Sequence, residues 1–256
     1  MGESRTEKNS YTVIFAIVMV FVVGALLAFA AKSLEPTITE NERLEKQQNI
    51  LYAMGINQNV EGDSNAEFVS TKEAPGLFNK YIKEQVVITN GPDGLKVEDD
   101  DQAYLIDVKK QKEIAKNGGV RKLPLFIGEK DGRTFYIAPI RGKGLWDAIW
   151  AYVAMDKDMV VEGAYFDHAG ETPGLGANMN KRFFMDDFTG ENLKNNEGDF
   201  VGINVVKGNG DPNNEDKKDN KVDALSGATI TSNGITAMIK NDLKLYIPYF
   251  KKLENQ

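Results

Sequence analysis

The chain has 256 residues, with 31 Lys and Arg against 38 Asp and Glu, one His and no Cys. The absence of cysteine excludes a disulfide framework, thiolate-ligated zinc or iron–sulfur sites and a cysteine nucleophile, and a single histidine excludes a multi-His metal centre. A net charge of −7 argues against a nucleic-acid partner, which needs a basic face. We therefore expect no metal site, and any redox chemistry must come from a bound cofactor.

The first predicted element is a transmembrane helix over residues 12–31, preceded by a short tail over residues 1–11. Only Thr12 and Gly24 of this run fall outside the hydrophobic set. Twenty helical residues span about 30 Å, the thickness of the hydrocarbon core of a bilayer. A cleavable signal peptide is the alternative, because the segment 28–30 resembles a cleavage site, but the run is longer than a usual signal core. Basic residues flank both ends, so charge alone leaves the orientation open.

Residues 32–120 are predicted to form a helical stalk and a variable N-terminal part of the globular region. The stalk is a helix that ends at Gly55 and begins at a threonine cap. The acidic run at residues 98–101 does not have the spacing of a calcium loop and is interpreted as a solvated turn. The elements expected here are a helix over 39–54, a turn-rich stretch over 57–75, a short helix passing into a strand over 79–88, and a strand over 104–108.

Residues 121–256 carry the clearer pattern and are predicted to form one domain. Two apolar runs, 125–127 and 135–137, flank the turn signal Lys130-Asp131-Gly132 and predict a hairpin. Strands grouped with a few helices indicate an α+β fold. The remaining expectations are a helix over 145–155, a strand over 160–166, a short helix over 182–188, a strand over 201–206, a surface loop over 208–221 and an amphipathic helix over 232–246.

Four glycine-bearing stretches could carry chemistry: residues 141–146, 171–176, 206–208 and 223–232. None of them is a Walker loop or a Rossmann fingerprint, so a conventional nucleotide pocket has little support. Each lies at a predicted strand end or before a helix, where exposed backbone amides can meet an anion.

The stretch 223–232 is the most informative of the four. Helix capping accounts for Thr231 or Ser232 but not for the hydroxyls of Ser226 and Thr229 further upstream. Small residues between those two hydroxyls would let a bulky group approach the backbone and the Thr229 side chain. The stretch therefore offers Thr229 as a place where a bulky group could approach the chain.

The tetrad Ser226-Gly227-Ala228-Thr229, with Asp223 ahead of it, resembles the covalent flavin attachment motif of the FMN-binding domain family. The resemblance implies that FMN is joined through its phosphate to Thr229 by a flavin transferase. The wider chain is similar to the family of C subunits of the Na+-translocating NADH:quinone reductases. The membrane span and the segments 142–146, 171–176, 206–208 and 225–234 carry this likeness. The family of G subunits of the Rnf complexes shares the span and two of the motifs but lacks the Gly-Leu-Trp segment, and is the alternative.

The same resemblance and the glycine-rich stretches suggest which other residues bind the cofactor. Lys207 could offset the phosphate or a reduced ring, but could also be an exposed strand-end lysine. Trp146 could pack on the flavin or belong to the core, and Glu171 could bind or cap locally. Asp223 is expected to shape the loop, or to bind metal with the transferase during attachment. The full predicted set is Ser226, Gly227, Ala228 and Asp223 beside Thr229, the backbone amides around Thr172, Gly174, Leu175 and Gly176, and the side chains of Lys207, Trp146 and Glu171.

The resemblance implies a single-pass flavoprotein of the bacterial inner membrane, with the globular part in the periplasm. It would carry electrons between other subunits of a sodium-translocating NADH:ubiquinone reductase, with no catalytic residue of its own. A flavin-free anchored scaffold module, in which residues 226–229 are only a loop before the last helix, is the remaining alternative.

Overall fold

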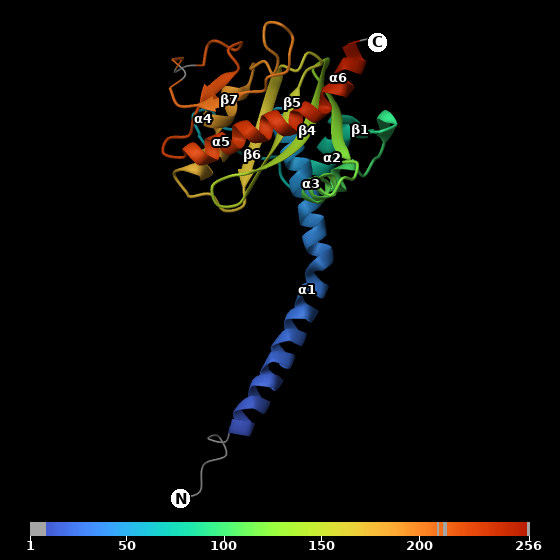
Figure 1. Ribbon diagram of the computed structural model, residues 1–256, viewed down its shortest axis with the longest axis vertical. Helices are drawn as coiled ribbons and strands as arrows, with labels where there is room; N and C mark the ends of the chain where they lie inside the picture. Colours follow the sequence, from blue (N-terminus) through green and yellow to red (C-terminus); the bar gives the residue numbers. More distant parts are fainter. Residues whose placement is uncertain (1–8, 209, 212–213, 255–256) are drawn as a thin grey trace, which may run out of the picture. The chain divides into compact units, whose positions relative to one another are not determined.

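The computed structural model describes residues 9–208, 210–211 and 214–254 (Figure 1). Most of the predicted tail, residues 1–8, lies outside them. The chain divides into two compact units, Met1–Arg43 and Leu44–Gln256. The strands of the second unit start before residue 121 and continue after it. The boundary at residue 121 remains a prediction from the sequence pattern.

Helix α1, Asn9–Ala53, contains the predicted membrane span. It is long and apolar enough to cross a membrane by length and composition, with a window of mean hydropathy 3.0. The predicted start of a separate stalk helix near Thr39 is wrong. The Thr39 hydroxyl donates back to the Glu35 carbonyl at 2.9 Å instead of capping a new helix, and Pro36 lies inside α1. The predicted end is confirmed, because Gly55 follows with a φ of +70°.

The second unit is built on a six-stranded antiparallel sheet with the order β2-β1-β3-β4-β5-β6. The predicted hairpin is confirmed as β3 and β4, and its turn places Asp131 and Gly132 at φ 51° and 73°. The strands are β1 Ile82–Gly91, β2 Gly94–Asp99, β3 Leu123–Lys130, β4 Arg133–Lys143, β5 Ala148–Met155 and β6 Val161–His168.

Two predicted elements have the wrong secondary structure. The apolar run 145–155, predicted as a helix, contains strand β5, which lies between β4 and β6 and is covered on both sides. A nearly continuous apolar run fits a central strand as well as a buried helix. The predicted strand 104–108 is instead a 3-10 turn, η2 Ala103–Leu105, followed by α3 Val108–Lys116. Asp107 begins that helix by accepting from the amides of Lys109 and Lys110.

Helical elements cover both faces of the sheet. The register places Gly163 and Gly128 on one face, where the end of α1 packs: a Cβ at Gly163 would lie 2.5 Å from the Ala53 carbonyl oxygen, and one at Gly128 would lie 2.5 Å from Met54. Helix α5, Thr229–Met238, packs on the opposite face, where Gly142 meets Met238. Figure 1 shows α5 lying across the sheet. Glycines at the contacts thus allow close packing on both sides.

The last helical stretch is longer than predicted. It begins at Thr229, three residues before the predicted start, and its predicted apolar face is buried. A π-helical turn, η5 Ile239–Leu243, places the Asp242 carboxylate inside, where it accepts from Arg121, Lys112 and the Arg141 amide. The stretch ends as η6 Lys244–Tyr246 and α6 Ile247–Glu254. The remaining elements are α2 Ala74–Tyr81, η3 Gly176–Asn180, α4 Arg182–Met185, η4 Asp186–Phe188, β7 Asn204–Val206 and β8 Lys221–Asp223.

The polar stretch 208–221 forms a loop in its described residues until β8 begins at Lys221, but it does not lie wholly on the surface. Asn214 is buried and lies close to Glu191, whose side chain is fully buried. Burial raises the pKa of Glu191 to about 7, although the Asn214 amide and the Lys217 ammonium partly oppose the shift. The Lys217 Nζ lies 3.9 Å from the carboxylate. Ionisation of Glu191 therefore costs the folded state free energy and lowers its stability.

We predict that this cost appears as a loss of stability with rising pH. Because the folded-state pKa is about 7 against 4.5 for a free carboxyl, the folded chain binds more protons between these values. The free energy of unfolding should fall across that window by at most about 3 kcal/mol. Urea unfolding at several pH values measures it. Glu191→Gln should lose this slope, and the exposed-site control Glu129→Gln should keep it; an unchanged slope in Glu191→Gln would contradict the assignment.

Candidate functional site

A cleft of about 230 Å³ forms where three segments far apart in the chain meet. They are the loop between β4 and β5, the loop after β6, and the first turn of α5. The cleft is lined by Leu145, Glu171, Thr172, Leu175, Gly176, Gly227, Ala228, Thr229, Ile230 and Thr231. The fold therefore brings two of the four glycine-bearing stretches, and part of a third, to one place.

Thr229 is the first residue of α5 and is exposed at the cleft. The preceding residue, Ala228, occupies the N-cap position and has no side chain that could cap the helix. The first amides of a helix have no partner within it, and the first turn of α5 contains no acidic residue. The Thr229 hydroxyl thus lies at the positive end of a helix that can receive an anion.

The geometry explains the glycine of the tetrad. Gly227 has a φ of +71°, in the left-handed region that side chains disfavour. A Cβ added there would also lie 2.8 Å from Cδ2 of Leu175. The close approach of Leu175 to the backbone at residue 227 therefore requires a residue without a side chain.

The turn over residues 172–176 forms the facing wall of the cleft. The Leu175 amide donates to the Thr172 carbonyl at 3.1 Å, so it closes the turn itself. Gly174 has a φ of +77°, which the turn requires. The Leu175 amide was predicted to bind the cofactor, but it is used within the turn. Leu175 instead contributes its side chain to the cleft, and the residue is 41% exposed.

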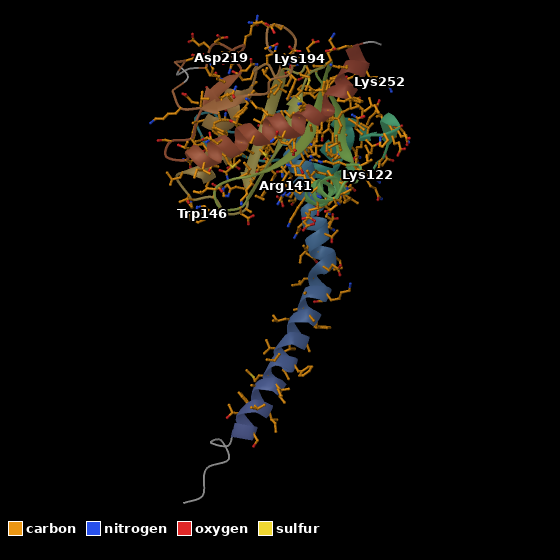
Figure 2. All side chains as sticks on the ribbon, in the orientation of Figure 1. Lys122, Arg141, Trp146, Lys194, Asp219 and Lys252 are labelled. Carbon is orange, nitrogen blue, oxygen red and sulfur yellow. The ribbon has the colours of Figure 1, made fainter. Side chains whose placement is uncertain are left out.

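Trp146 does not lie in the core, since its side chain is 66% exposed. Its indole Nε1–H donates to the Thr172 hydroxyl at 3.1 Å, which ties the loop after β4 to the turn at 172–176. Figure 2 shows Trp146 at the edge of the domain. The exposed apolar side chains at the cleft, here called the apolar rim, are Leu145, Trp146, Leu175 and Ile230.

Glu171 is buried at the base of the site and joins its three segments. One carboxylate oxygen accepts from the Thr231 hydroxyl at 2.5 Å, and the other accepts from the Trp146 backbone amide at 3.0 Å. The carboxylate takes the space that a Cβ at Gly144 or Gly176 would occupy. One glycine in each of two predicted stretches is thus explained by the same buried carboxylate.

The structure places Lys207 and Asp223 beside the cleft rather than in its lining. Strands β7 and β8 pair in parallel, with Val206 opposite Asp223, so Lys207 and Asp223 lie at the same end of that pair. The Ala224 amide donates to the Val206 carbonyl at 2.8 Å, which fixes the start of the chain leading to Ser226. Ser226 is exposed and borders the cleft through Gly227.

Three lining residues are absent from the set predicted by sequence: Leu145, Ile230 and Thr231. A signal was available for Ile230, because it is an apolar residue off the buried face of the last helix. Thr231 fits a helix cap by residue type, but its hydroxyl donates to Glu171 from inside the helix.

We predict that the packing around Glu171 tolerates no added methyl group. A Cβ at Gly176 would lie 2.5 Å from the Glu171 carboxylate and 2.7 Å from the Thr231 hydroxyl, which are held by their own hydrogen bond. Gly176→Ala should lower the free energy of unfolding by about 1–3 kcal/mol. Gly170→Ala, whose Cβ would meet only Asp147 at 3.9 Å, should stay within about 0.5 kcal/mol. Urea unfolding checks both, and equal losses would contradict this packing around the carboxylate.

Comparisons with known proteins identify related sequences that cover this region. The model of the FMN-binding domain family matches residues 144–244, which include all lining residues of the cleft. The C subunit of the Na(+)-translocating NADH-quinone reductase of Pseudomonas aeruginosa is 31% identical over 250 residues, covering 92% of both chains. The C subunit of the same reductase from Yersinia pestis is 30% identical over 237 residues, covering 88% of this chain and 84% of that protein.

Solved structures show the same fold. The C subunit of the Na(+)-translocating NADH-quinone reductase of Parabacteroides distasonis has a TM-score of 0.69 and 33% identity, and the match covers 85% of this chain and 96% of that one. The NqrC of Shewanella oneidensis has a TM-score of 0.66 and 25% identity, with coverage of 84% and 99%. These matches favour the quinone reductase over the Rnf complex. The chain belongs to the family of C subunits of the Na(+)-translocating NADH-quinone reductases and contains an FMN-binding domain.

Proposed function

We propose that the chain is a membrane-anchored electron carrier whose FMN is bound covalently, through its phosphate, to the hydroxyl of Thr229. The observation that carries this proposal is the position of Thr229, exposed in a cleft at the N-terminus of α5. The chain would act as one part of a Na+-translocating NADH:quinone reductase and would not be catalytic alone.

The surroundings of Thr229 suit a phosphodiester. A diester carries one negative charge rather than nearly two, so the amides of an uncapped helix turn can receive it without a cluster of basic side chains. Lys207 is the basic side chain of the predicted set, and it follows β7 at the end of the β7–β8 pair from which the chain leads to the tetrad. The positive charge of Lys207 would act on the phosphate from outside the residues that line the cleft.

The cleft also fits the rest of the cofactor. The Leu175 side chain packs against the backbone at Gly227, and the apolar rim to which it belongs offers surface for a flat ring beside Thr229. FMN, when bound, supplies the one-electron and two-electron redox chemistry that the side chains of this chain lack. Covalent attachment prevents dissociation, so the ring can remain open to redox partners. An exposed site of this kind suits electron transfer better than conversion of an enclosed substrate.

The cellular arrangement is part of the proposal. Helix α1 would anchor the chain in the inner membrane as a single span, with the globular unit in the periplasm. The partners would be the other subunits of the complex, which lead electrons towards ubiquinone, and a flavin transferase during maturation. Asp223, half-buried at the end of β8, would shape the approach to the tetrad or assist the transferase.

Replacement of the attachment residue tests the linkage. When the chain is co-expressed with a flavin transferase, we expect fluorescence of the denatured protein in a gel, and Thr229→Ala should abolish it. The matched control Ser226→Ala removes the other exposed hydroxyl of the tetrad and should retain the signal. Fluorescence that persists in Thr229→Ala would refute attachment at this residue. A wild-type chain without flavin would favour a scaffold module.

Charges placed in the span test the anchor. An arginine at the centre of a membrane helix costs about 2.5–3.5 kcal/mol, so the double variant Phe21→Arg, Val22→Arg should release the chain from the membrane fraction. The control Asn41→Arg lies outside the apolar run and should remain bound. N-terminal sequencing of the membrane-extracted chain should show residues that precede the run. A first residue at Ala31 would instead indicate cleavage of a signal peptide.

A further inference from the structure

Glu171 is a carboxylate in an unusual setting for an acidic side chain. It is 4% exposed, yet it forms no ion pair with any Lys, Arg or His that the structure describes. Its two hydrogen-bond donors, the Thr231 hydroxyl and the Trp146 amide, are neutral. Burying a charge without a cationic partner is costly, and both donors are needed to offset that cost.

The residues around Glu171 are arranged to keep the carboxylate in place. Its own amide donates to Nδ1 of His168 at 3.2 Å, which fixes the backbone just after β6. Gly144 and Gly176 leave space for the two carboxylate oxygens, and a Cβ at either position would collide with them. The buried Glu171 carboxylate therefore connects the loop after β4, the loop after β6 and the first turn of α5.

Glu171 also lines the same cleft as Thr229. We propose that Glu171 is a positioning residue that holds the three walls of the cleft together and, through its buried charge, lowers the reduction potential of the flavin attached there. This inference rests on the proposed function. Reduction places additional negative charge on the ring, and a carboxylate in a site of low dielectric opposes it more strongly than one in water.

Glu171 takes no part in the electron transfer itself. Each electron that reaches the flavin comes from one redox partner in the complex and leaves to another, and the carboxylate neither gains nor loses an electron. Its charge acts on the energy of the reduced flavin, and its two hydrogen bonds hold the walls of the cleft in place.

The test compares variants that separate charge from length, in the full chain carrying its flavin. Glu171→Gln keeps the length and an acceptor for the Trp146 amide but removes the charge, so the midpoint potential, measured by spectroelectrochemical titration, should become more positive. Glu171→Asp keeps the charge but is too short for both hydrogen bonds, so it should retain a potential close to that of the wild type. The control Glu129→Gln, which removes an exposed carboxylate elsewhere, should leave the potential unchanged.

A flavin-free background measures the positioning role by itself. The background is Thr229→Ala, which we expect to carry no flavin. In it, Glu171→Asp should lower the melting temperature more than Glu171→Gln does. The reason is that the shorter aspartate loses one hydrogen bond between the walls of the cleft. A role limited to packing would lower the melting temperature without moving the potential.

Equal potentials in the wild type and Glu171→Gln would overturn the electrostatic part of the inference. If Glu171→Gln does not fold or accept flavin, the pair Glu171→Asn and Glu171→Asp makes the same comparison at shorter length, and equal potentials in that pair would also overturn it. A wild-type chain that takes up no covalent flavin refutes the proposed function instead, so the two failures are distinct.

Discussion

The site depends on how closely α5 lies against the end of β4. Gly234 of α5 meets the backbone of Lys143 so closely that a Cβ at Gly234 would overlap the Lys143 carbonyl oxygen. One turn further on, Gly142 leaves room for Met238, where a Cβ would lie 2.8 Å away. This contact fixes the axis of α5, and with it the place where its first turn reaches the surface. Thr229 is exposed at the cleft because the rest of the helix is held against the sheet.

The segments that form the cleft are joined by hydrogen bonds to one buried carboxylate, that of Glu171. Segments more than eighty residues apart in the chain converge on the Glu171 carboxylate, which holds them through Trp146 and Thr231. The apolar rim remains outside this contact and stays exposed. An apolar opening is consistent with the proposed site, in which a flat ring remains accessible. The same arrangement explains why glycines recur in stretches that share no sequence pattern.

Much of the fold and the place of the candidate site could be predicted from the sequence, because the signals were local. A twenty-residue apolar run, a turn signal between two apolar strands and a tetrad of small and hydroxyl residues each lie within a short window. The run 145–155 was misassigned because its burial between two strands is decided by neighbours distant in sequence. The place of Lys207 depended on the parallel pairing of β7 with β8, and Leu145 became a site residue only through tertiary contact. No local pattern predicts these contacts.

The most direct test of the central claim is peptide mass analysis of the mature chain after cleavage at lysine. The peptide Val222–Lys240 contains the whole tetrad and the first turns of α5. Covalent attachment predicts that this peptide carries the added mass of FMN less one water, and that fragmentation places the addition on Thr229. An unmodified peptide from a chain matured with its flavin transferase, or an addition located on Ser226, would contradict it.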